Sequence, residues 1–277
     1  MRRLWRRSKT ATVGLVLTAL LFVSAAAAPL LAPHAPEAVP RDLVRASLQP
    51  PSPRHPLGTD LLGRDVLSRV IYGARISLLV GFGAELVAVV LGVAVGMLAG
   101  YAGGWTDALL MRLTDTFLAF PSLVLAIAMM AAFQQPGLLN VVVVLSLLGW
   151  TGIARVMRAQ TLVVMGRDFV QSAQAAGAGT LRILLRYVLP NCLAPLMVAA
   201  TIGIAGNILA EAGLSFLGIG VSPPTPSWGL MLAQGRSELT THPWVTIFPG
   251  LAIMLTVLGL NLLGDGLRDL LDPQLRR

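Results

Sequence analysis

Apolar runs long enough to cross a lipid bilayer occupy most of this sequence, and they constrain its fold more than any other feature. The hydrocarbon core of a bilayer, roughly 30 Å thick, needs about 20 residues of helix at a rise of about 1.5 Å per residue. Runs of this length lie at residues 10–31, 76–100, 116–154, about 191–221 and about 245–263. The run 116–154 is too long for one span, and the turn sequence Gln134–Gly137 divides it into two helices. The sequence therefore predicts an all-α polytopic membrane protein with about six transmembrane helices.

The low charge content excludes an ordinary water-soluble domain. Charged residues make up only 12% of the chain, whereas globular domains carry about 25%. The net charge of +8 does not indicate nucleic-acid binding, because the arginines lie at the ends of the apolar runs and do not cluster on one exposed face. We therefore expect membrane lipid to surround the chain, and we expect it to bind no nucleic acid.

The first run, residues 10–31, has two interpretations. Ala25–Ala28 followed by Pro29 resembles the cleavage site of a secretory signal. However, the apolar stretch exceeds the roughly 7–15 residues that are usual in such signals. An uncleaved span is therefore favoured, and in both interpretations the next segment emerges on the outer side.

The distribution of basic residues predicts the orientation of the spans. With the N-terminus inside, fourteen of the 21 lysines and arginines fall on inner segments and seven fall on outer segments. Because cytoplasmic loops of membrane proteins are enriched in basic residues, both termini are expected on the cytoplasmic side.

Three regions follow from this topology. Residues 1–33 hold the N-terminal tail and the first span, residues 34–75 form an outer segment, and residues 76–277 form the transmembrane core. The outer segment begins rich in proline and is therefore extended. It then becomes amphipathic, and Thr59 or Asp60 is expected to cap a helix that lies along the membrane surface.

Three histidines fall on the outer side of the membrane. His34, His55 and His242 show no spacing typical of metal ligands. The sequence therefore predicts no metal site, and it predicts no cofactor.

Small and polar residues mark particular faces of two spans. Gly92, Gly96 and Gly100 recur every four residues and predict a face for close helix packing. Glu85 projects to nearly the same side, and a charge at mid-membrane costs at least about 2.5 kcal/mol. This cost indicates either a functional role or a protonated or hydrogen-bonded packing residue. In the fifth span a polar stripe predicts either a lined pathway or a helix–helix seam, and it comprises Gly203, Asn207, Glu211 and Ser215.

Proline interrupts three of the predicted spans. Pro121, Pro195 and Pro249 remove backbone hydrogen bonds and are expected to kink their helices. Such prolines are common in membrane helices, so they do not by themselves indicate gating.

The inner loop at residues 155–190 contains the most distinctive local pattern. Phe169, Ala173 and Ala176 form one small apolar face, and Gly177 then permits a sharp turn. Residues 180–188 predict a second short helix, which Leu189-Pro190 joins to the fifth span. This pattern indicates a docking surface for a soluble partner, and the alternative is an ordinary basic loop.

The pattern resembles the EAA loop of permease subunits in bacterial ABC importers, in which Glu-Ala-Ala is followed three residues later by Gly and further on by Leu-Pro. Here Gln171 and Ser172 replace the motif's Glu and first Ala, which leaves Gly177 and the helix pair in place. By this resemblance the residues that couple to the ATPase are Phe169, Val170, Gln171, Ser172, Ala173, Gly177, Leu189 and Pro190.

Three longer strings resemble the C-type permease of dipeptide, oligopeptide and nickel importers. They are HPLGTDLLGRDVLSRVIYGARISLLVG at residues 55–81, LSFLGIGVSPPTPSWG at 214–229 and NLLGDGLRDLLDPQLR at 261–276. The resemblance implies a six-span subunit of a bacterial cytoplasmic membrane. Its implied partners are a second permease, two cytoplasmic ATPases and an external substrate-binding protein. The outer segments around residues 55–69 and 223–228 are candidates for meeting the binding protein or for forming an outer gate.

The chain itself has no Gly-x-x-x-x-Gly-Lys-Ser/Thr loop, so ATP hydrolysis is expected only in a partner. The implied cargo is a di- or oligopeptide, with nickel or another metal complex as the alternative. Specificity in such importers lies largely with the binding protein, so the cargo is mostly invisible in this chain.

Two other functions compete with this interpretation. A proton-coupled secondary transporter would use Glu85 or Glu211 as a relay, but no inverted repeat is evident. An intramembrane hydrolase would use Ser215 as nucleophile and His242 as base, but no third orienting group is apparent.

Overall fold

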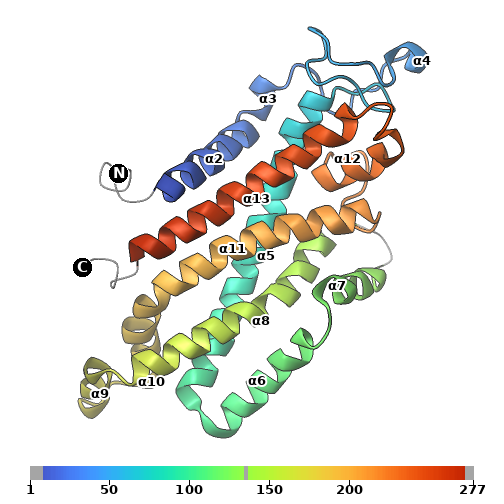
Figure 1. Ribbon diagram of the computed structural model, residues 1–277. Helices are drawn as coiled ribbons and strands as arrows, with labels where there is room; N and C mark the ends of the chain where they lie inside the picture. The colour runs from blue at the N-terminus through green and yellow to red at the C-terminus, as the bar shows by residue number, and fades with distance from the viewer. Residues whose placement is uncertain (1–8, 134–136, 272–277) are drawn as a thin grey trace.

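The computed structural model describes residues 9–133 and 137–271, and helices joined by loops make up this part of the chain (Figure 1). The helices in order are α2 (Lys9–Ala26), α3 (Ala28–Leu31), α4 (Leu43–Ala46), α5 (Val66–Ala102), α6 (Gly104–Leu118), α7 (Ser122–Ala131), α8 (Leu138–Met165), α9 (Asp168–Ala175), α10 (Thr180–Ile183), a π-helical turn (Leu184–Val188), α11 (Leu189–Phe216), α12 (Trp228–Gly235), a 3₁₀ turn (Arg236–Glu238) and α13 (Trp244–Leu271). Thr59 and Asp65 form an isolated antiparallel bridge, and the described residues contain no longer strand.

Five helical stretches are long and apolar enough to cross a membrane. They are α2, α5, α8, the continuous stretch from α10 through α11, and α13. The pair α6 and α7 passes the same test but is bent by 86°, and it makes a sixth span if the two are counted as one. The predicted all-α membrane fold with about six spans is confirmed.

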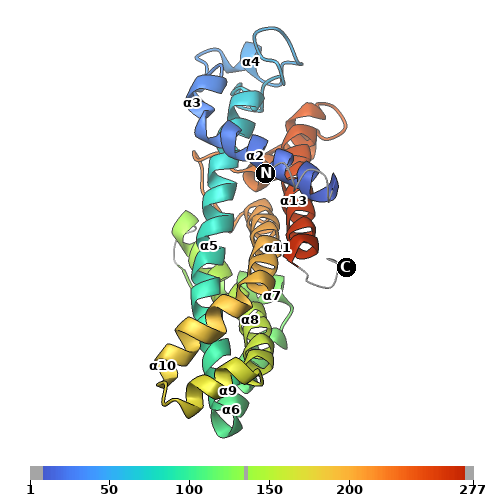
Figure 2. The same ribbon diagram turned by 90° about the vertical axis from the view of Figure 1, so that its left-hand side faces the viewer.

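In Figure 1, α8, α11 and α13 run from upper right to lower left, and α5 crosses behind them at a steeper angle. Helix α9 lies at one end of the molecule, and α4 and α12 lie at the opposite end (Figures 1 and 2). Helix α2 runs toward α3, whereas α13 starts beside α12 and runs away from it. The start of α2 and the finish of α13 therefore point away from the end that carries α4.

The second span begins earlier than expected, because α5 is one helix of 37 residues. Asp65 caps it, and its side chain accepts a 2.8 Å hydrogen bond from the Ser68 N–H. The prediction that Thr59 or Asp60 caps a separate surface helix is wrong. Gly63 adopts a left-handed φ of 70° inside a turn, so no helix can run from Asp60 into the span.

The third span also differs from the prediction. A single helix starting at Thr116 and kinked at Pro121 was expected, but α6 starts at Gly104 and α7 starts only at Ser122. Proline disfavours the helical conformation of the residue before it and lacks the N–H of a helical hydrogen bond, so the backbone turns sharply here. Helices α11 and α13, by contrast, continue through Pro195 and Pro249.

Parts of two predictions lie outside the described residues. Of the predicted turn at Gln134–Gly137, only Gly137 is described, and it precedes the first turn of α8. Six of the basic residues used for the orientation are also outside: Arg2, Arg3, Arg6, Arg7, Arg276 and Arg277.

Glycines allow a close contact between α5 and α8. A Cβ atom added at Gly92 would lie 2.7 Å from the Trp150 carbonyl oxygen, and one at Gly100 would lie 2.8 Å from Cβ of Thr161. At Gly96 it would collide with the Ala154 carbonyl oxygen. The two backbones can approach this closely only because these positions have no side chain.

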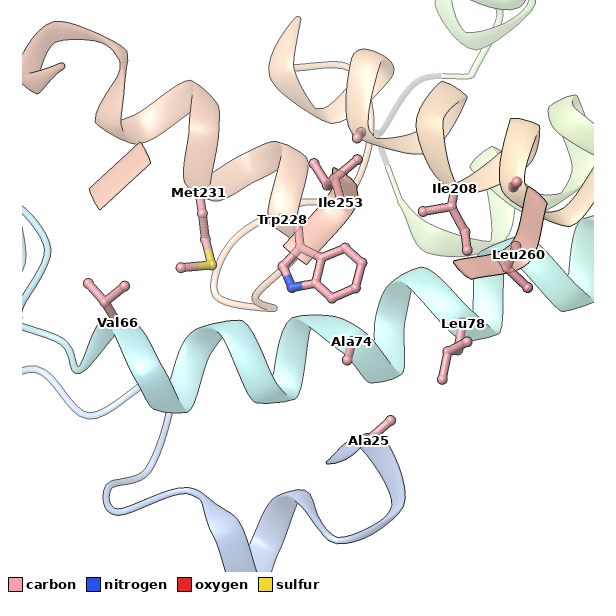
Figure 3. Packing of buried hydrophobic residues seen from close by; sticks show 11 residues of the cluster. Ala25, Val66, Ala74, Leu78, Ile208, Trp228, Met231, Ile253 and Leu260 are labelled. Atoms are coloured by element: carbon pink, nitrogen blue, oxygen red, sulfur yellow. The ribbon is translucent and has the colours of Figure 1, made fainter. Parts of the chain in front are cut away.

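Helix α12 is a short buried helix that the sequence did not predict. Ser227 caps it by accepting a 3.2 Å hydrogen bond from the Leu230 N–H. Figure 3 shows Trp228 packed against α5, between Val66 and Leu78, with Met231 beside it. The indole Nε1 of Trp228 donates a 2.9 Å hydrogen bond to the Val70 carbonyl oxygen, which holds α12 on α5.

Candidate functional site

Helix α9 is anchored by one buried side chain. Val170 is fully buried and packs in a cluster that contains Val164 of α8, Ile183 of α10 and Cys192 of α11. Since this cluster joins the helices before and after α9, a displacement of α9 must carry α8 and α11 with it or break the cluster.

The opposite face of α9 is open. Phe169 is 44% exposed, and Gln171 and Ser172 are exposed, whereas Ala173 is half-buried. Asp168 lies in the first turn, where a negative charge interacts favourably with the helix dipole. The predicted coupling residues thus divide into one anchor, Val170, and a small exposed surface.

Gly177 closes α9 and turns the chain toward α10. Its φ of 80° lies in the left-handed region, which side chains other than glycine rarely adopt. The Gly177 N–H donates to the Gln174 carbonyl at 2.9 Å, and the Ala178 N–H donates to the Ala173 carbonyl at 3.0 Å. No atom lies within 4 Å of a Cβ built on Gly177, so backbone conformation and not space requires glycine. Leu189 and Pro190 open α11 after the π-helical turn.

Polar contacts tie α6, α8 and α10 to their neighbours, close to the helix predicted to couple. The Tyr101 hydroxyl, near the end of α5, hydrogen-bonds to Thr180 Oγ1 of α10 at 2.9 Å. Arg158 of α8 forms a two-pronged ion pair with Asp107 of α6, at 2.5 Å for each contact. In the sequence, Arg158 contributed only to the count of basic residues on the inner side. Its pairing with Asp107 could not be predicted, because the two residues lie far apart in the chain.

A second ion pair links the same two helices. Arg155 Nη2 of α8 lies 2.6 Å from Asp115 Oδ1 of α6. Both side chains are about half exposed, so water screens this pair. The less exposed pair, Arg158 with Asp107, is therefore the stronger of the two links between α6 and α8.

The polar residues within the spans form two separate pairs. Asn207 Nδ2 of α11 donates a 2.9 Å hydrogen bond to Glu85 Oε2 of α5. The Ser215 hydroxyl donates a 2.7 Å hydrogen bond to Glu211 Oε1 and accepts one of 3.0 Å from the Val221 N–H. Glu85 Oε1 and Glu211 Oε2 are buried and have no hydrogen-bond partner among the described residues.

A largely apolar groove of about 840 Å³ runs between α7, α8, α11 and α13. Asn207 lines it together with Ser122, Leu145 and Gly206. The other residues predicted for a pathway, Glu85, Glu211 and Ser215, are buried and do not line this groove.

The residues proposed for a hydrolase make separate contacts. Ser215 pairs with Glu211, whereas His242 Nδ1 pairs with Glu238 Oε2 at 2.8 Å. The hydrogen bond from His242 lowers the pKa of Glu238 below its ordinary value. The structure therefore does not bring the serine and the histidine together as a nucleophile and its base.

A buried charged network at the end near α4 was missed by the sequence analysis. Arg69 is fully buried and lies 3.4 Å from the Asp60 carboxylate, which also accepts a 2.8 Å hydrogen bond from Arg64. Gln234 of α12 accepts a 3.0 Å hydrogen bond from Arg64. The network joins the outer turn, α5 and α12, and a mixed charge pattern around Asp60 is its only trace in the sequence.

Comparison with known proteins places most of the chain in one family. Residues 92–277 match the family described as binding-protein-dependent transport system inner membrane component. Residues 1–51 match the N-terminal TM domain of oligopeptide transport permease C.

Curated relatives match along nearly the whole chain. A di/tripeptide transport system permease protein of Pseudomonas aeruginosa is 44% identical over 285 residues, covering 100% of this chain and 93% of that protein. A dipeptide transport system permease protein of Bacillus subtilis is 42% identical, covering 99% and 85%. A glutathione transport system permease protein of Pectobacterium atrosepticum is 46% identical, covering 82% and 75%.

One solved structure supports the fold independently. A chain of the MetNI methionine ABC transporter, solved in inward-facing conformations, matches with a TM-score of 0.60. The match covers 72% of this chain and 94% of that chain at 20% identity. At this identity the likeness establishes the fold alone.

Proposed function

The chain belongs to the family of binding-protein-dependent transport system inner membrane components, the permease subunits of ABC importers, and on that premise we propose that it carries di- or oligopeptides across a bacterial cytoplasmic membrane. The relatives named for dipeptides and tripeptides support this cargo. A transport component of this kind is no enzyme by itself. We infer that a second permease, two cytoplasmic ATPases and an external binding protein complete the importer.

The observation that carries this proposal is the construction of α9. One buried valine, Val170, fixes the helix to the bundle, and the face around Gln171 and Ser172 stays open. Gly177 then redirects the chain through a conformation that a flexible loop would not need. A short helix that is packed on the bundle through one face and exposed on the other can bind a partner and transmit its movement to the bundle.

In the proposed mechanism, ATP-driven closure of the ATPases displaces α9. The displacement passes through the Val170 cluster to α8 and α11, and through the Tyr101–Thr180 contact to α5. The two permeases then alternate between inward and outward access. Such a shift requires contacts whose free energy differs between the two states, which the anchored helix supplies and a loose tether would not.

The groove between α7, α8, α11 and α13 is the proposed contribution of this chain to the pathway. It is open at one side, and a second permease would complete its wall. Asn207 supplies a polar group in this otherwise apolar lining and so could contact the peptide backbone. Glu85 lies behind Asn207 and orients it.

The proposed orientation places α9, the start of α2 and the finish of α13 on the cytoplasmic side. The location of α9 at one end of the molecule supports this arrangement, since ATPases are cytoplasmic. In this orientation α3, α4 and the turn at Asp60 face outward. Residues 1–33 then form the first span, 34–75 the outer segment and 76–277 the transport core.

Reconstitution of the full importer in proteoliposomes tests the proposal. We expect uptake of a labelled dipeptide to require internal ATP and the binding protein, and Gly177→Val to reduce it at least tenfold. The strain of a side chain at left-handed φ, about 1–2 kcal/mol, would distort the coupling turn. Gly179→Val is the matched control, because Gly179 has a φ of −68° and equally open space around its Cβ position.

Two outcomes would contradict the proposal. Uptake driven by a proton gradient without ATP would make the chain a secondary transporter. Uptake of a nickel complex in place of peptides would retain the importer and replace its cargo.

A further inference from the structure

Two histidines and an aspartate converge at the start of α5. Nδ1 of His55 lies 2.9 Å from Oδ1 of Asp65, and Nδ1 of His34 lies 3.8 Å from the same oxygen. The two imidazole rings stack with a centroid distance of 4.7 Å. One possible ligand atom from each of the three residues lies within 4.8 Å of the other two.

The surrounding contacts hold the three side chains in place. Asp65 Oδ2 accepts hydrogen bonds from the Ser68 N–H at 2.8 Å and the Ser68 hydroxyl at 2.7 Å, which turns Oδ1 toward the histidines. Ser68 Oγ also accepts a 3.1 Å hydrogen bond from the His34 N–H. Ser52 Oγ accepts one of 3.1 Å from the His55 N–H. Each ligand residue is therefore fixed through its backbone or its second oxygen.

His34 shows that a histidine–aspartate hydrogen bond does not explain the whole cluster. That bond accounts for His55 and Asp65. Nδ1 of His34, however, is buried, faces the same carboxylate and has no hydrogen-bond partner among the described residues. A buried polar atom normally has a partner, and a nitrogen lone pair near a second imidazole and a carboxylate can bind a cation.

We propose that His34, His55 and Asp65 bind one divalent transition-metal ion of the zinc class. Zinc binds histidine nitrogen at about 2.0–2.1 Å and carboxylate oxygen at about 2.0–2.2 Å, so neighbouring ligands of a tetrahedral ion lie about 3.4 Å apart. The distances of 2.9 and 3.8 Å lie on either side of that value. The third pair, His34 and His55, lies within 4.8 Å, so the two imidazoles would have to approach by up to about 1.4 Å to hold a tetrahedral ion. Water would take the fourth position, because both histidines are partly exposed.

The donor set decides the class of ion. Two imidazole nitrogens and one carboxylate suit zinc, nickel or copper, whereas magnesium and calcium take oxygen ligands. The neighbouring arginines form no ion pair with Asp65, because Arg64 and Arg69 both pair with Asp60. Asp65 Oδ1 thus faces the two histidines and no arginine.

A bound ion would fasten the proline-rich connector to the first turn of α5. His34 follows α3, His55 ends the extended stretch, and Asp65 caps the long span. The site lies in the outer connector and not in the groove proposed for cargo. It is therefore a structural or regulatory site, and its failure would leave the importer assignment unchanged.

Zinc titration of the purified full-length chain tests the proposal, after chelation and removal of the chelator. We expect one zinc ion per chain for the unaltered protein and an affinity at least tenfold lower for His34→Ala. His242→Ala is the matched control: it removes another histidine of the same end, whose Nδ1 already pairs with Glu238. The control should bind zinc as the unaltered protein does.

A second measurement separates loss of metal from loss of fold. Zinc should protect residues 35–54 from proteolysis in the unaltered protein and in His242→Ala, but not in His34→Ala. Without metal, His34→Ala should unfold at a slightly lower temperature, because the stacking of His34 on His55 is lost. Addition of zinc should raise the unfolding temperature of the unaltered chain and of His242→Ala, but not that of His34→Ala. Absence of zinc binding, or equal affinity of His34→Ala and the unaltered chain, would overturn the proposal.

Discussion

Asn207 of α11 and Glu85 of α5 are joined by a 2.9 Å hydrogen bond in the middle of the helix bundle. Both side chains are buried, with 8% and 4% of their surface exposed. Gly203 leaves the space that the carboxylate fills, since a Cβ atom there would collide with both Glu85 oxygens. The arrangement is that of a buried tie between two spans, in which Asn207 alone reaches the groove.

Glu85→Gln separates a tie from a proton relay. The glutamine amide keeps an acceptor for Asn207 but cannot exchange a proton, so ATP-dependent peptide uptake should stay within about threefold of the unaltered importer. Asn207→Ala leaves the Glu85 carboxyl without that partner and should lower the free energy of unfolding by about 1–3 kcal/mol. Uptake assays and thermal unfolding in detergent measure the two effects. Complete loss of uptake in Glu85→Gln with intact protein would instead indicate a relay.

Gly96→Ala should separate α5 from α8. The added methyl group collides with the Ala154 carbonyl oxygen and lies 2.8 Å from Cβ of Met157, neither of which can rotate away. Overpacking of this kind costs about 1–3 kcal/mol, so the yield of folded protein on size-exclusion chromatography should fall. Gly83→Ala, in the same helix, meets only Val142 Cγ1 at 3.8 Å and should fold normally. Equal yields of the two variants would show that the glycine contact does not set the helix spacing.

The ion pair between Asp107 and Arg158 should couple α6 to α8. The side chains are 18% and 34% exposed, and the contact is two-pronged, so a double-mutant cycle should give a coupling energy of about 0.5–3 kcal/mol. Thermal unfolding of Asp107→Ala, Arg158→Ala and the double variant measures it. Arg112→Ala is the control, since Arg112 lies in α6 but forms no ion pair among the described residues. Additive effects of the two single variants would mean that the pair contributes nothing.

The spans were predictable because a lipid core demands length and low polarity, and both can be read from the order of residues. The first and last residues of the helices were less predictable. Asp60 and Asp65 are equally good helix caps in sequence, and the left-handed turn at Gly63, which decides between them, depends on contacts of the folded connector. Pro121 indicated a disturbance of the third span, but the residue alone does not distinguish a kinked helix from the 86° bend between α6 and α7 that the structure has.

The functional residues were predictable where their pattern is local and not where distant residues come together. The turn at Gly177 was evident because its pattern is local, with every contributing residue in one short segment. The cluster of His34, His55 and Asp65 was missed, because its members lie in separate parts of the outer connector and have no regular spacing. The partners of Arg158 and Glu85 were missed for the same reason, since helix packing brings them together from distant parts of the chain. Helix α12 carried a signal in Ser227, a capping residue directly before Trp228.

Site-directed cross-linking of α9 tests the central claim most directly. Ser172→Cys places a thiol on the open face of α9, and the one native cysteine, Cys192, is fully buried and should not compete. Val44→Cys is the control, because Val44 is 93% exposed in α4 at the opposite end of the molecule. We predict that a thiol-to-amine cross-linker joins Ser172→Cys, and not Val44→Cys, to an ATPase in intact cells. Recovery of no ATPase, or labelling of Ser172→Cys from outside by a membrane-impermeant thiol reagent, would contradict the account.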